Sequence, residues 1–136
     1  MAILQYSTLL RNNQLDQIDI TAGGTAVMKI RTGAPPANVA AADTGTVLAT
    51  LTLPASWMAV ASGGSVVKAS TWEDLSADAA GTAGHFRVYA NDGTTCHIQG
   101  DVAQTGGTAS MIVDNVVFAA GQAFTVTQFT VTAGNS

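Results

Sequence analysis

Short stretches of alternating apolar and polar residues dominate this chain, a pattern typical of half-buried β-strands. In 26–31, the apolar residues fall on one face and the charged residues Lys29 and Arg31 on the other. The stretch 46–53 repeats the alternation until Pro54, which ends it. There we expect Val47, Ala49, Leu51 and Leu53 to face inward and Leu48, Thr50 and Thr52 to face outward.

Turn residues separate the remaining strand-like stretches. Ser62–Gly64 predicts a hairpin between strands 57–61 and 65–69, and Asn91–Thr94 predicts one between 85–90 and 95–100, because Asn, Asp and Gly tolerate positive φ. Further strands are expected at 110–113, 116–119 and 123–132. The segments 32–46, 76–84 and 104–108 are rich in small and turn residues and are expected to be loops.

Only the segment Ser7–Ile20 has the spacing of an amphipathic helix. Leu10, Leu15 and Ile18 recur near helical spacing, Ser7 or Thr8 can cap the helix, and Gly23–Gly24 can end it. These elements predict an all-β fold, a β-sandwich or jelly roll of about eight short antiparallel strands with one N-terminal helix. A single domain, 1–136, is expected, with 1–22 as an N-terminal arm and helix.

Charge is scarce, and this narrows the range of functions. Only 10% of the residues are charged, the net charge is −4 and the mean hydropathy is +0.28, whereas soluble domains average about 25% charged. The five basic residues are scattered, so we expect ordinary surface charges with one or two interface salt bridges, and no nucleic-acid partner. No apolar run is long enough for a membrane span, and the N-terminus lacks the features of a secretory leader, so neither is expected.

Residues with reactive side chains do not form a recognisable catalytic or metal-binding motif. Cys96 and His97 are adjacent, so in a strand they point to opposite faces and cannot act as nucleophile and base. We expect Cys96 to be a small core residue. His85 and His97 form a weak metal-site alternative, but no carboxylate stands at ligand spacing. The chain is therefore expected to have no catalytic residues, no cofactor and no metal, and not to be an enzyme.

Two further groups of residues leave alternatives open. Asp16 and Asp19 are three residues apart on the predicted helix and are expected to form a solvated or partner-facing edge. Trp57 and Trp72 are expected to be core or interface anchors, with stacking on a sugar as the alternative. The turn Ser70–Asp74, which contains Trp72, is the one grouping that favours sugar binding.

Several stretches in order along the chain carry a resemblance: STLLRNNQLDQIDITAGGTAVMKIRTGAPPANVAAADTGTVLATLTLP, ASGGSVVKAS, SADAAGTAGHFRVYANDGTT and FTVTAGN. Together they resemble a family of small virion structural proteins encoded by tailed bacteriophages and prophages. The resemblance implies a virion component that is assembled in the cytoplasm of the host bacterium. It favours a capsid decoration (cement) protein that binds the major capsid protein. The alternative is a tail or appendage component, including a glycan- or receptor-binding β-sandwich module.

The N-terminal segment is the candidate contact with a partner. It carries more apolar residues than one narrow helical stripe can bury, and Ile3, Leu4, Leu9 and Leu10 are the candidate partner contacts. The competing interpretation is that the segment plugs one end of the sandwich. Because the chain combines few charges with positive mean hydropathy, we also expect a homo-oligomer, a dimer or a trimer.

Overall fold

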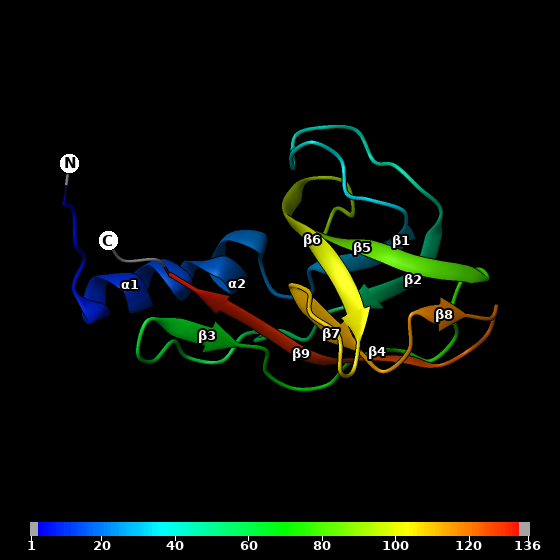
Figure 1. Ribbon diagram of the computed structural model, residues 1–136. Helices are drawn as coiled ribbons and strands as arrows, with labels where there is room; N and C mark the ends of the chain where they lie inside the picture. Colours follow the sequence, from blue (N-terminus) through cyan, green and yellow to red (C-terminus); the bar gives the residue numbers. More distant parts are fainter. Residues whose placement is uncertain (1–2, 134–136) are drawn as a thin grey trace.

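The computed structural model describes residues 3–133, so residues 1–2 and 134–136 of the predicted domain lie outside the described part. The chain is mostly β, and one curled sheet of nine strands forms its body, with the helical region at one end (Figure 1). In chain order the elements are α1 (Thr8–Leu15), α2 (Gln17–Ala22), β1 (Val27–Thr32), β2 (Val47–Thr52), β3 (Ser65–Val67), β4 (Trp72–Asp74), β5 (Gly81–Tyr89), β6 (Cys96–Gln104), β7 (Met111–Val113), β8 (Val117–Phe118) and β9 (Phe124–Thr132).

The sheet runs in the order β2-β1-β5-β6-β7-β9-β3, with β4 also paired to β9 and β8 to β5. Most pairs are antiparallel, as predicted, but β6 and β7 are parallel, so the expectation of a purely antiparallel fold was wrong. Asp101 helps the short connection 105–110 to bring β7 back beside β6, because its Oδ1 accepts a hydrogen bond from Ser110 N at 2.7 Å. The sandwich or jelly-roll assignment stays a prediction.

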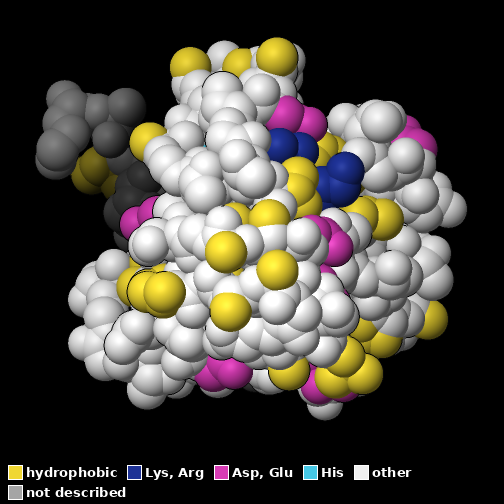
Figure 2. All heavy atoms as spheres, turned by 90° about the vertical axis from the view of Figure 1, so that its right-hand side faces the viewer, with side chains coloured by type: hydrophobic (Ala, Val, Ile, Leu, Met, Phe, Trp, Pro, Cys, Tyr) yellow, Lys and Arg dark blue, Asp and Glu magenta, His cyan; other side chains and the backbone are white. Residues whose placement is uncertain are grey.

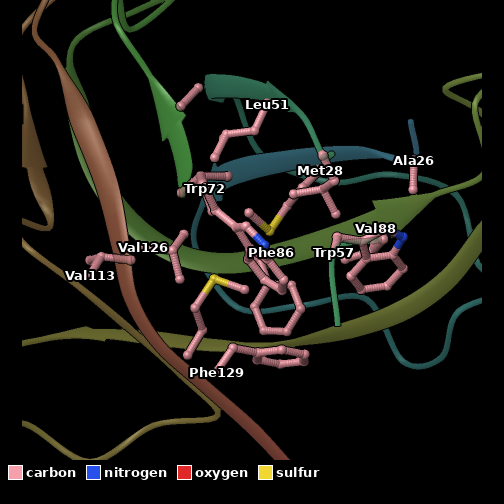
Figure 3. Close-up of a cluster of buried hydrophobic side chains, with 14 of the residues drawn as sticks. Ala26, Met28, Leu51, Trp57, Trp72, Phe86, Val88, Val113, Val126 and Phe129 are labelled. Atoms are coloured by element: carbon pink, nitrogen blue, oxygen red, sulfur yellow. The ribbon is translucent and has the colours of Figure 1, made fainter. Parts of the chain in front are cut away.

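Aromatic side chains from both halves of the curled sheet meet in the core (Figure 3). Phe86 of β5 lies edge-on to Phe129 of β9 with ring centroids 5.6 Å apart, and Trp72 of β4 packs on the same Phe129 at 5.6 Å. Trp57 completes the cluster at 5.7 Å from Trp72. Such pairs favour tilted and edge-to-face geometries, so this cluster ties strands distant in the sequence to one core.

The alternation in β1 is confirmed on its apolar face, where the side chains are fully buried. In β2 one prediction was wrong: Leu48, expected to face outward, is fully buried. The cause is a β-bulge, because Ile30 is paired with Ala49 and Arg31 with Val47, so that Leu48 is the extra residue. A bulge interrupts the period of two, which a reading of strict alternation cannot anticipate.

The hairpin of β5 and β6 is confirmed, and its turn is held by Asp92. The side chain of Asp92 accepts hydrogen bonds from the backbone N–H groups of Thr94 and Thr95 and from the Thr95 hydroxyl, which together lower the Asp92 pKa well below its usual range. The turn at Ser62–Gly64 is also confirmed, since Ser62 and Ser65 exchange backbone hydrogen bonds. The expected strand 57–61 was wrong, because only Met58 forms an isolated bridge, to Lys68. The boundaries of two loops were also wrong: β5 begins at Gly81, inside the expected loop 76–84, and β4 occupies part of the expected turn 70–74.

The N-terminal helical region is confirmed but is divided in two at Asp16. Ser7 caps α1, as predicted, by accepting a hydrogen bond from Leu10 N at 3.1 Å. Gly23 ends α2 with a φ of 92°, a value that favours glycine. Within the described residues no helix has the length and apolar character needed to cross a membrane.

Candidate functional site

Helix α1 turns polar side chains toward its own domain. The Asn12 side chain accepts a hydrogen bond from Gly64 N at 2.9 Å, and Asp16 Oδ1 accepts one from Ala61 N at 2.8 Å. Arg11 Nη1 reaches Ala133 O at 3.5 Å. Asp16 was expected to form a solvated or partner-facing edge, which was wrong: it holds the helix to the hairpin 57–69. These bonds set the rotation of α1 about its axis.

Leu15 of α1 is buried in the core, but four other large apolar side chains of the segment are exposed. Ile3 is 74% exposed, Leu4 61%, Leu9 70% and Leu10 45%. The segment that precedes α1 extends away from the sheet at the far end of the molecule (Figure 1). All four candidate partner contacts are therefore exposed, whereas Leu15 and Ile18 of the same segment pack against the core. That the exposed residues contact a partner stays a prediction.

A shallow groove of about 240 Å³ separates the helical region from the first half of β6. It is lined by Ile18 and Ile98, both partly buried against the core, and by Gln14, Gln17, Thr21 and His97. The groove contains few groups with catalytic potential, and its chemistry suits an apolar or main-chain ligand better than a charged one.

A cluster of charged groups is buried on the opposite side of the sheet, beneath the loop 33–46. Arg87 is 1% exposed, donates to Val39 O at 2.8 Å and to Ala41 O at 3.2 Å, and is paired with Asp43. Arg31 is 7% exposed and lies 3.1 Å from the other Asp43 oxygen. The expectation that these arginines are ordinary surface charges was wrong, because the long loop covers the sheet face that they occupy.

The neighbours of Asp43 in this cluster lower its pKa. Partial burial alone would raise the Asp43 pKa, but hydrogen bonds from Tyr89 and Arg87 and the charge of Arg31 hold it below its usual value. Burial and the 2.7 Å hydrogen bond to Asp43 raise the Tyr89 pKa. These contacts fasten the loop 33–46 to the sheet.

The remaining candidate residues are spread over the fold. Cys96 is only half-buried, so the expectation of a core cysteine was wrong, and its thiol lies 3.3 Å from Ile98 O. His97 is exposed at the groove, whereas His85 is fully buried with Nδ1 2.8 Å from Gly33 O. His85 is paired with Asp101 and is therefore not opposite His97. Among residues 3–133, no three His, Cys, Asp or Glu side chains are grouped so as to hold a metal ion.

Both tryptophans belong to the core, as expected. Trp57 is fully buried and donates to Gly23 O at 3.0 Å, and Trp72 is 1% exposed and donates to Ala69 O at 3.0 Å. A sugar could not stack on either ring without disrupting the core, so neither tryptophan forms the glycan platform considered as an alternative.

No signal in the sequence identified the groove or the burial of Arg31 and Arg87 under the loop 33–46, since both depend on contacts between distant segments. The polar stripe Arg11, Asn12 and Asp16 could have shown the orientation of α1, because these residues also share one helical face. No protein-family model, curated protein or solved structure matches this chain.

Proposed function

We propose that this chain is a structural protein of a bacteriophage virion, and specifically a capsid decoration protein that binds and stabilises the major capsid shell. The observation that carries the proposal is the exposure of four large apolar residues, Ile3, Leu4, Leu9 and Leu10, in a segment whose polar side chains bond to the chain itself. A monomer gains nothing from exposing such residues, whereas a subunit contact buries them.

The rest of the surface supports a role in assembly. Charged side chains are few, and uncharged atoms make up most of the face in Figure 2. Uncharged surface loses little hydration when it packs against a neighbour, because ionic groups carry the largest desolvation cost. A decoration protein is held by many copies of a moderate contact, and avidity then compensates for the modest strength of each one.

The architecture is compatible with the same role. We infer that the curled sheet is a variant of the β-sandwich, because its two halves face each other across the aromatic core through the Phe86 and Phe129 contact. We also infer that the protein has no catalytic activity, since its two histidines and its cysteine lie in separate surroundings.

Fractionation of disrupted virions tests the proposal. Heads and tails are separated after disruption, and the protein is followed in each fraction with an antibody. We expect it with empty heads, and we expect the variant in which Leu9 and Leu10 are both changed to Ser to be lost from heads while remaining folded. Recovery with tails would assign the chain to the tail or an appendage, and absence from both fractions would refute a virion role.

A further inference from the structure

The first half of β6 has an unpaired edge. Residues 96–101 pair with β5 on one side, but β7 pairs only with 102–104 on the other. Within residues 3–133 no other strand or loop backbone is hydrogen-bonded to this edge. Alternate residues of an edge strand direct N–H and C=O groups outward, and such groups readily accept an additional strand.

The groove described above includes part of this edge strand. His97 and Ile98 of β6 line it together with Ile18 of α2, so an incoming strand would find apolar contacts next to unpaired backbone groups. The combination of main-chain pairing with a side-chain pocket is the recognition mode of β-augmentation. Because no Asp, Glu, Lys or Arg lines the groove, the matching ligand is an extended, uncharged and apolar segment.

The chain carries such a segment in its own arm. Residues 3–7 precede α1 without regular secondary structure, and Ser7 has the extended values φ −62° and ψ 155°. The arm contains no charged side chain, and Ile3 and Leu4 are exposed. We propose that the arm of one copy adds as a strand to the β6 edge of a second copy, and that two copies exchange arms reciprocally.

The arm of the same copy is a poor occupant for its own groove. In the structure the arm leads away from the sheet (Figure 1). To enter its own groove it would have to fold back along α1, because the groove begins at Gln14 and continues along α2. The arm of a second copy can enter from outside without reversing its direction.

The area available favours reciprocal exchange over a single contact. A large aliphatic side chain offers about 100 Å² of apolar area, so Ile3 and Leu4 of the arm offer roughly 135 Å² and, with their backbone, about 180 Å². One arm in one groove buries about twice this area, and two arms in two grooves bury roughly 700 Å², which is below the ~1,200 Å² of standard interfaces and typical of weak contacts. We therefore expect a dimer that dissociates on dilution.

The inference rests on the proposal that the N-terminal segment is a subunit contact, but it does not require a virion location. It is tested on the purified full-length protein by analytical ultracentrifugation over a range of concentrations. We expect a monomer–dimer equilibrium that L4D weakens roughly 10- to 100-fold. The matched control V117D changes an equally exposed side chain (59%) on β8, at the other end of the molecule, and should not affect it.

Disulfide trapping identifies the acceptor site. In the C96A background, L4C combined with T21C should give a covalent dimer on non-reducing gels, whereas L4C combined with V117C should not. A wild-type protein that stays monomeric at high concentration overturns the inference, as does an L4C/T21C disulfide that forms only within one chain or a dimer insensitive to L4D. The fractionation experiment changes Leu9 and Leu10 of α1, which lie outside the arm, so the two proposals can fail separately.

Discussion

Arg87 illustrates how single residues hold this fold together. Its guanidinium lies under the loop 33–46 and is surrounded by the carbonyls of Val39 and Ala41 and the carboxylate of Asp43. A buried cation requires such partners, because an unpaired charge in a protein interior is strongly destabilising. Asp43 supplies the only carboxylate among these partners in the described part of the chain and also accepts the Tyr89 hydroxyl.

We expect Asp43→Asn to destabilise the protein by about 2 kcal/mol near neutral pH. Loss of one member of a buried pair costs ~3–5 kcal/mol, but Asp43 is 39% exposed and Arg87 keeps its carbonyl acceptors, so the effect is smaller. Urea unfolding measures the change. The control Glu73→Gln removes a charge from an exposed site on β4 and should stay within about 0.5 kcal/mol.

The difference in unfolding free energy between wild type and Asp43→Asn depends on pH, and the direction follows from the Asp43 pKa shift. The pKa is lower in the folded protein than in the unfolded chain, so the stabilisation is complete above the unfolded value of ~3.9 and is lost as pH falls through the folded value. Wild type and Asp43→Asn should therefore differ most near neutral pH and converge in acid. A difference that persists unchanged in acid would contradict an ionic role for Asp43.

Cys96 and His97 should be dispensable. Cys96 is half-buried and His97 is exposed, so we expect Cys96→Ala to cost less than about 1 kcal/mol and His97→Ala to be near neutral. Thermal unfolding measures the stability of both variants, and virion assembly measures their function. If either variant folded normally but failed in assembly, the inference that these residues have no functional role would be wrong.

At the level of elements, the orientation of α1 depends on a few polar anchors. We expect Asp16→Ala to free the helical region from the hairpin at 57–69 with a cost of about 1–2 kcal/mol, because it leaves Ala61 N without its charged acceptor. Hydrogen exchange should show faster exchange in α1 and at Ala61, with the sheet unchanged. The exposed neighbour Asn13→Ala serves as the control, and equal protection in both variants would show that Asp16 does not anchor the helix.

At the level of the whole molecule, Phe129 connects the two halves of the sheet. Phe129→Ala should cost about 3–5 kcal/mol, because the cavity removes contacts with both Trp72 and Phe86. Fluorescence and far-UV circular dichroism should report the same lowered urea midpoint, since one core serves the whole fold. Gln128→Ala, an exposed change on the same strand, should leave the midpoint nearly unchanged. Separate transitions by the two probes would indicate two independent folding units.

Interactions between residues close in the sequence were enough to predict part of the fold. Alternation in 26–31 predicted the buried face of β1, the Asn91–Thr94 turn predicted the β5–β6 hairpin, and Ser7 predicted the start of α1. In each case residues close in the sequence decide the outcome through side-chain direction, a tolerated positive φ or a capping hydrogen bond. The exposed apolar residues at the N-terminus were also recognisable, because a narrow helical stripe cannot bury so many of them.

The tertiary structure decided everything that depends on partners far apart in the chain. Leu48 is buried because of a bulge opposite β1, Arg31 and Arg87 are buried because a loop folds over their face, and β6 lies parallel to β7 because the connection turns back. The groove along β6 likewise requires α2 to stop beside an edge that β7 covers only in part. A sequence specifies which residues prefer burial, but the register, the covering loop and the open edge arise only when distant segments compete for the same sheet face.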